Sequence, residues 1–224
     1  MRPELRRVGQ AQTPVVMVDE VTGDSRTVVD IAVALAPFPP AAGTYYPGLR
    51  RAITPADADA SAYVERTLQT IAPFIGGGFD ADSFDLIEAS FSMVVARPET
   101  LDPAQRAPHF DSTDPDYLAV LHYLSDTPGT AFYRQRATGI EVVTPANQAA
   151  FIAGARRDSA GLSGYTAGSN AAFEQIGLVE GRADRLVIYP GRLLHSGVIP
   201  PEMSFSDDPR QGRLTANMFV RARR

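Results

Sequence analysis

The downstream two thirds of the chain is a series of short segments in which apolar and polar residues alternate. These segments are residues 85–96, 117–124, 130–135, 140–144, 185–190 and 212–222. They are rich in β-branched and aromatic residues, and Gly, Pro, Asp and Ser separate them. A period of two is typical of strands with one buried face, so this series predicts a β-sandwich or barrel.

The first third of the chain has a different pattern, with one strand and two helices. We expect a strand at 14–21, a helix at 26–36 that Asp24 or Ser25 caps, and a second helix at 57–72. A third helix is expected at 145–158, and 38–50 is expected to be a loop because of its Pro and Gly content. The fold class is therefore α+β, mainly β, with the N-terminal helices packed on one sheet. The sequence contains no repeat and no linker, which favours a single domain over residues 1–224.

Cysteine and lysine are both missing from the sequence, and their absence excludes several classes of chemistry. The chain has no cysteine and no lysine, so all 21 basic residues are arginine. This excludes disulfides, thiolate metal sites, Schiff-base lysines and the lysine of a phosphate-binding P-loop. A net charge of −5 argues against nucleic-acid or membrane partners. With neither an apolar span nor a secretory signal in the sequence, we expect a cytoplasmic protein.

The three histidines suggest a metal site. His109 and Asp111 are two positions apart, so in an extended segment both side chains leave the same side of the backbone. An H-x-D pair alone is more often a surface feature than a metal site. His195, however, follows an apolar strand that a folded sheet can bring beside the pair. Two imidazoles and one carboxylate form the facial triad of non-haem Fe(II) oxygenases.

A second pattern, downstream of His195, fits a dicarboxylate cosubstrate such as 2-oxoglutarate. Arg213 opens the last strand, and Thr215 lies two positions later on the same face. A guanidinium binds a carboxylate through two parallel hydrogen bonds, and the threonine hydroxyl can add a third. A surface salt bridge is the other interpretation of Arg213.

The order of these motifs resembles a known family. The pattern H-x-D, "AVLHYL", "GTAFYR", "RLVIYPGRLLHSG" and "GRLTANMFVRA" is similar to the Fe(II)/2-oxoglutarate-dependent dioxygenases, most of all to their prolyl-hydroxylase-like branch and its bacterial relatives. The resemblance implies a double-stranded β-helix (a jelly-roll, cupin-like fold). It also implies that His109, Asp111 and His195 bind Fe(II). Arg213 would bind the distal carboxylate of 2-oxoglutarate, assisted by Thr215 and Tyr123.

The resemblance also implies an activity and leaves alternatives open. It predicts a hydroxylase that acts on a C–H bond of a peptide, an amino acid or a small metabolite. Residues 200–211 lengthen the spacing between His195 and Arg213, which keeps Arg210 as the alternative carboxylate anchor. The other possible functions are a cupin-type metalloenzyme without 2-oxoglutarate and a jelly-roll binding module with a vestigial metal site. Oligomeric state is not predicted.

Other residues have weaker predictions. His122 alternates with Tyr123, so we expect it on the outer face of the sheet as a packed histidine rather than a ligand. Tyr133, Arg134 and Arg50 are candidates for the substrate mouth. The glycine-rich segment 161–170 is a candidate lid.

Overall fold

The computed structural model describes residues 1–41 and 46–224. Within these ranges the chain forms strands that are all paired antiparallel, together with a few helices. The elements are β1 (Arg2–Val8), β2 (Thr13–Asp19), α1 (Ser25–Ala34), β3 (Gly48–Ala52), α2 (Ala58–Phe79), β4 (Ser83–Val94), the 3₁₀ helix η1 (Pro98–Thr100), α3 (Pro103–Arg106), β5 (Tyr117–Tyr123), β6 (Thr127–Gln135), α4 (Gln148–Ser159), β7 (Phe173–Gly181), β8 (Arg185–Pro190), β9 (His195–Gly197) and β10 (Leu214–Arg223).

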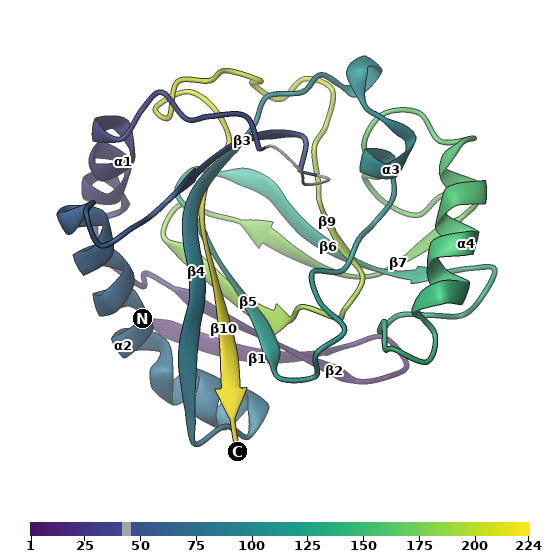
Figure 1. The fold of residues 1–224 in the computed structure, drawn as a ribbon, viewed down its shortest axis with the longest axis horizontal. Helices are drawn as coiled ribbons and strands as arrows, with labels where there is room; N and C mark the ends of the chain where they lie inside the picture. The colour runs from purple at the N-terminus through teal and green to yellow at the C-terminus, as the bar shows by residue number, and fades with distance from the viewer. Residues whose placement is uncertain (42–45) are drawn as a thin grey trace.

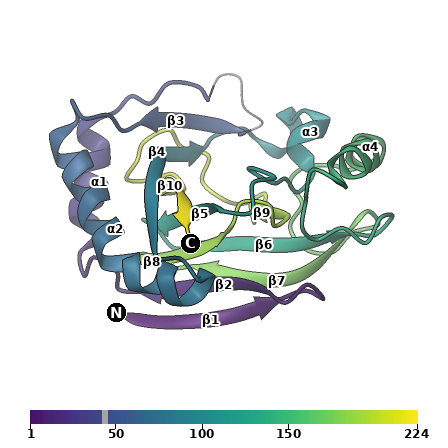
Figure 2. The same ribbon diagram turned by 60° about the horizontal axis from the view of Figure 1, so that its bottom comes forward.

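The strands form two sheets. The larger sheet has the order β1-β2-β8-β5-β10-β4-β3, and the smaller sheet has the order β7-β6-β9. Helices α1 and α2 lie together on one side of the molecule, and α4 lies on the opposite side (Figure 1). In the turned view the strands lie between the α1–α2 pair and the α3–α4 pair (Figure 2). The predicted mainly β class, with N-terminal helices on one sheet, is confirmed.

The outer face of the larger sheet is covered by α1 and α2. Apolar residues of α2 recur at helical spacing, and Ile71 and Ile75 are fully buried against the sheet. On β10 the even-numbered residues, such as Met218, belong to the same core. Complete burial of an isoleucine side chain stabilises a fold by about 2 kcal/mol, so this interface fixes the helices on the sheet.

The inner face of the larger sheet has two parts, one packed against the smaller sheet and one that lines a pocket. Toward β2 and β8 it packs against the smaller sheet through a second apolar cluster that includes Met17, Val187 and Phe132. Toward β10 and β4 the inner residues are polar and line a pocket instead. Strand β10 shows the division clearly, because Thr215 on this strand and Arg213 just before it line the pocket, while Leu214 and Ala216 face the helices.

Several boundaries differ from the prediction. Helix α2 continues past residue 72 to Phe79 and includes Pro73. Pro73 lies on the exposed side of the helix, where the carbonyl that loses its donor can bond water. Residues 140–144 are not a strand, because their pairing with residues 192–194 contains only the single bridge Val142–Leu193.

The prediction also missed four strands: β1, β3, β7 and β9. Strand β1 is an edge strand that carries three arginines and is exposed along most of its length, so it lacks the alternation that marks a half-buried strand. Strand β3 lies at the end of the segment expected to be a loop. None of the helices within the described ranges has both the length and the apolar character that crossing a bilayer requires.

Candidate active site

The pocket between the two sheets has a volume of about 370 Å³. All three side chains of the predicted metal site line it, as do Arg213 and Thr215. Five of the six predicted site residues therefore line the pocket. The sixth, Tyr123, is fully buried behind the pocket wall.

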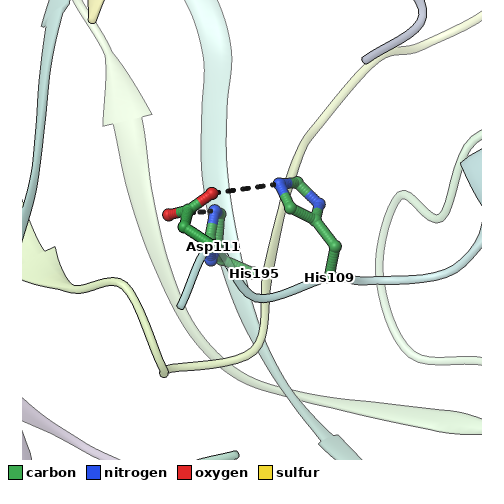
Figure 3. Close-up of side chains that lie close together, drawn as sticks. All are labelled: His109, Asp111 and His195. Atoms are coloured by element: carbon green, nitrogen blue, oxygen red, sulfur yellow. Dashed lines mark ion pairs between the residues drawn. The ribbon is translucent and has the colours of Figure 1, made fainter. Parts of the chain in front are cut away.

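The metal-site residues lie close together in space. The Nε2 atom of His109 lies 3.8 Å from one carboxylate oxygen of Asp111, and Nε2 of His195 lies 3.5 Å from the other. One ligand atom from each residue lies within 4.8 Å of the other two. Figure 3 shows a nitrogen of each imidazole directed at the Asp111 carboxylate. Two nitrogens and one oxygen at this separation form a donor set that fits a divalent transition metal.

The backbone sets this arrangement. His109 and His195 exchange two backbone hydrogen bonds, each 2.9 Å long, so the two histidine residues form an isolated antiparallel bridge. The Asp111 amide donates to the Gly191 carbonyl at 2.7 Å. A side chain at Gly191 would place its Cβ 2.6 Å from the Tyr117 ring and 3.3 Å from the Asp111 Cβ. The close approach of these segments therefore requires glycine at 191.

The three side chains carry their metal-binding protonation states near neutral pH. Burial lowers the pKa of His195 to about 4, and its Nδ1–H donates to the Leu193 carbonyl at 2.8 Å, which leaves Nε2 free to bind a metal. Enclosure within the pocket and the nearby His195 lower the pKa of His109 to about 4. Burial raises the pKa of Asp111 to about 6, although the charges of His109 and Arg50 oppose the rise.

Arg213 is the second notable feature of the pocket. Its side chain is only 5% exposed, and its Nε is buried without a hydrogen-bond partner. Within the described ranges no carboxylate forms an ion pair with this guanidinium. A buried unpaired charge is costly, so this site fits an anionic ligand.

Thr215 and Tyr123 lie near Arg213 on neighbouring strands. They are register partners on β10 and β5, and Thr215 is almost fully buried in the pocket wall. The Tyr123 hydroxyl donates to the Thr130 hydroxyl at 2.6 Å, and Thr130 lines the pocket. Contact of Tyr123 itself with a cosubstrate stays a prediction.

Other predicted candidates lie elsewhere. Arg210 is 55% exposed and pairs with Asp30 at 2.6 Å, outside the pocket. Tyr133 is buried and bonds the Thr166 carbonyl, and Arg134 pairs with Glu141 and Glu174. Neither Tyr133 nor Arg134 is part of the pocket wall that the described residues form.

His122 lies on the outer face of the larger sheet, as predicted. Its Nδ1 is 2.7 Å from the Tyr63 hydroxyl, and its Nε2 is 3.1 Å from the Asp184 carboxylate. The ring is fully buried in this network between α2 and the sheet. Its interpretation as a packed histidine is confirmed.

Several further pocket residues were not predicted individually, among them Glu88, Tyr117, Tyr165 and Asn217. Asn217 carries a signal that sequence reasoning could have used, because it lies two positions after Thr215 and therefore on the same strand face. Tyr165 lies in the glycine-rich segment 161–170, and its hydroxyl donates to the Ala96 carbonyl at 2.7 Å. This bond ties that segment to the chain after β4.

Comparison with known proteins identifies the family. A family model with the description "Family of unknown function (DUF6445)" matches residues 1–220. The chain belongs to this family. A search of curated proteins finds no significant match.

Solved structures share the fold at low sequence identity. The non-haem α-ketoglutarate-dependent epimerase SnoN from nogalamycin biosynthesis aligns with a TM-score of 0.56 and 13% identity, over 95% of this chain and 79% of SnoN. HygX from Streptomyces hygroscopicus, with nickel and 2-oxoglutarate bound, aligns with a TM-score of 0.54 and 14% identity, over 94% of this chain and 83% of HygX. The iron-bound form of HygX gives a TM-score of 0.52 at 15% identity, over 94% and 82% of the two chains. At these identities the likeness shows a shared fold.

Proposed function

We propose that this protein is an Fe(II)- and 2-oxoglutarate-dependent oxygenase that hydroxylates a C–H bond of a small molecule or peptide. The fold would be a double-stranded β-helix that forms one domain over residues 1–224. Similarity to SnoN, an α-ketoglutarate-dependent enzyme, and to HygX, which was solved with 2-oxoglutarate, supports the proposal.

One observation carries the proposal. A two-histidine, one-carboxylate cluster and a buried guanidinium with an unpartnered Nε face the same pocket. The cluster leaves open coordination positions on a metal, and the guanidinium can bind a carboxylate. A cosubstrate with a keto acid at one end and a carboxylate at the other matches both features.

The proposed roles of the residues are metal binding and cosubstrate binding. His109, Asp111 and His195 would hold Fe(II), with the Leu193 carbonyl fixing the tautomer of His195. Arg213 would bind the distal carboxylate of 2-oxoglutarate, and Thr215 would donate a further hydrogen bond. When bound, Fe(II) and 2-oxoglutarate together supply the oxidising power with dioxygen.

The rest of the pocket would keep water away from the reacting groups. Tyr189 packs edge-on against the His195 ring, with 4.7 Å between the ring centroids. Tyr117 and Phe219 pack together at 5.3 Å on the same side of the pocket. These aromatic side chains make a low-dielectric wall, in which the interaction between Arg213 and a carboxylate is stronger than in water.

The test is binding and turnover with defined variants. Anaerobic addition of Fe(II) and 2-oxoglutarate should give a visible charge-transfer band, and aerobic incubation should release succinate. His109→Ala should lose metal binding, measured by metal analysis after gel filtration. Arg213→Gln should bind the metal but lose 2-oxoglutarate, while the matched variant Arg210→Gln should retain both.

Each rival function gives a different result. A cupin-type enzyme without 2-oxoglutarate would bind metal but show no charge-transfer band on addition of 2-oxoglutarate. A vestigial binding module would bind no divalent metal at all. Equal binding of 2-oxoglutarate by Arg213→Gln and by the unchanged protein would contradict the anchor assignment.

A further inference from the structure

A second arginine faces the pocket. Arg50 lies on β3, where it is the register partner of Ser92 on β4, and Ser92 is in turn the partner of Thr215 on β10. Register partners on antiparallel strands point to the same face, so Arg50 and Thr215 lie on the inner face of the larger sheet. Both residues line the pocket.

The hydrogen bonds of Arg50 are incomplete. Its Nε is buried and has no hydrogen-bond partner. Its Nη1 lies 3.8 Å from a carboxylate oxygen of Glu88, a distance too long for a hydrogen bond, and the Glu88 side chain is 54% exposed. Such a pair contributes little, so the guanidinium retains most of its capacity to bind an acceptor.

The guanidinium is nevertheless held in place. It lies over the Tyr46 ring, 5.1 Å from the ring centroid, and Glu88 is at its Nη1 side. Contact with an aromatic face restricts the long arginine side chain before any ligand arrives. The side chain itself is 26% exposed, so it is open toward the pocket but not fully solvated.

Arg50 lines the same pocket as the three residues of the metal cluster and as Arg213. Both arginines act on Tyr46, whose pKa is raised by burial and lowered in part by their charges. The pocket therefore contains two guanidiniums, and 2-oxoglutarate has one distal carboxylate.

We propose that Arg50 binds a carboxylate group of the substrate, so that the substrate is a carboxylate-bearing molecule. This inference rests on the proposed function, in which Arg213 is occupied by 2-oxoglutarate. The Nε–H of Arg50 and one of its Nη–H groups would donate to the two oxygens of the substrate carboxylate, in the bidentate geometry that a guanidinium favours. Arg50 would then hold the charged group of the substrate beside the metal cluster and orient the reacting carbon toward the cluster.

The neighbouring side chains fit the body of such a substrate. Tyr117 and Phe219 pack with their rings inclined by 30° and line the pocket along with Phe110. Asn217, also in the pocket wall, is 8% exposed and can bond a polar group of the substrate. An apolar wall with a few fixed polar groups is the usual character of a small-molecule site.

The test uses fluorine NMR with the full chain loaded with Zn(II) and saturating 2-oxoglutarate. The probes are 4-fluorobenzoate, 4-fluorophenylacetate and N-trifluoroacetyl-alanine, each compared with its neutral primary amide. We expect at least one acid to bind saturably, with its amide at least tenfold weaker. Excess 2-oxoglutarate should not displace the bound acid, because the acid occupies a different arginine.

Variants assign the site. Arg50→Gln should weaken binding of the acid at least tenfold and leave 2-oxoglutarate binding unchanged. Arg51→Gln is the matched control, because Arg51 is on the opposite face of β3, where it pairs with Asp57 at 2.6 Å, and it should bind the acid normally. Arg50→Lys retains the charge and should give an intermediate affinity, which keeps the test decisive if Arg50→Gln does not fold.

Three outcomes would overturn the inference: no acid binds, the amides bind as well as the acids, or Arg50→Gln binds the acid as the unchanged protein does. The charge-transfer band of the Fe(II) form separates this failure from failure of the proposed function. If 2-oxoglutarate gives the band and Arg50 has no effect on the probes, only the substrate inference is wrong. If no band forms, the proposed function itself is wrong.

Discussion

The unpaired charge of Arg213 predicts that a variant without it is more stable than the natural chain when no cosubstrate is present. Arg213 is 5% exposed and, within the described ranges, forms no ion pair, so folding buries its Nε without a hydrogen-bond partner and provides no carboxylate to offset its charge. Arg213→Met removes the charge and keeps most of the apolar volume. Because replacing buried charged groups by apolar ones gains about 1–4 kcal/mol, we expect a gain of about 2 kcal/mol in the free energy of unfolding. For a chain of this length the gain corresponds to a rise in Tm of about 4–8 °C.

Adding 2-oxoglutarate should reverse this order. With Zn(II) present and 2-oxoglutarate at about 100 times its Kd, ligand binding stabilises the natural chain by about 2.7 kcal/mol. The variant lacks the guanidinium that is proposed to bind the distal carboxylate, so it should gain little. The natural chain then becomes the more stable of the two by slightly under about 1 kcal/mol.

The assay is chemical denaturation of both proteins with and without 2-oxoglutarate, supported by calorimetry. Arg210→Met serves as the control, since Arg210 is exposed and its ion pair with Asp30 should contribute less than about 1 kcal/mol. The reasoning is refuted if Arg213→Met is destabilised in the absence of ligand. That result would mean that the guanidinium is already compensated inside the folded chain.

Three further predictions concern single contacts. Gly197→Ala would place a Cβ 3.2 Å from Nη2 of Arg213, so we expect 2-oxoglutarate affinity to fall about tenfold while metal binding is unchanged, as measured by titration of the charge-transfer band. Tyr63→Phe removes the 2.7 Å bond to the buried His122 and should cost about 2 kcal/mol in chemical denaturation, and an unchanged stability would contradict a structural role for this network. Burial opposes ionisation of Asp184, but hydrogen bonds from His122, Thr22 and Gly23 outweigh it and lower the pKa from 3.8 to about 2. The ionised Asp184 therefore stabilises the fold by about 2 kcal/mol above about pH 4, and this stabilisation is lost as the pH falls toward 2. The difference in the free energy of unfolding between the natural chain and Asp184→Asn should shrink over that range. A constant difference would refute the assignment.

The sequence predicted the features that local spacing determines. The two-residue separation of His109 and Asp111, and of Arg213 and Thr215, places each pair on one side of an extended segment. The long alternating segments are strands in the structure. One face of each strand packs against the helices, and the other face lies toward the pocket, so alternate residues have different surroundings. Period two is a property of neighbouring residues, so a single sequence reveals it.

The missed features depend on partners far away in the chain. Strand β9 has three residues and exists because residues 195–197 pair with 130–132 on β6. Strand β7 contains Gly177, where a Cβ would lie 2.9 Å from the Val8 side chain. Close packing therefore requires a glycine at this position, and the glycine interrupts the apolar pattern of the strand. Residues 140–144 have strand-like composition, but their backbone groups bond the turn at 192–194, for example Val143 N–H to the Arg192 carbonyl at 2.8 Å. The local sequence does not reveal these long-range contacts.

The reciprocal backbone bonds between His109 and His195 have a consequence for how the centre is assembled. Because main-chain bonds of 2.9 Å hold the two residues side by side, the spacing of their imidazoles does not depend on an ion to gather them. In the proposed metal centre, a cation would therefore enter or leave without rearrangement of the surrounding chain. Metals of similar radius should then exchange while the fold stays intact.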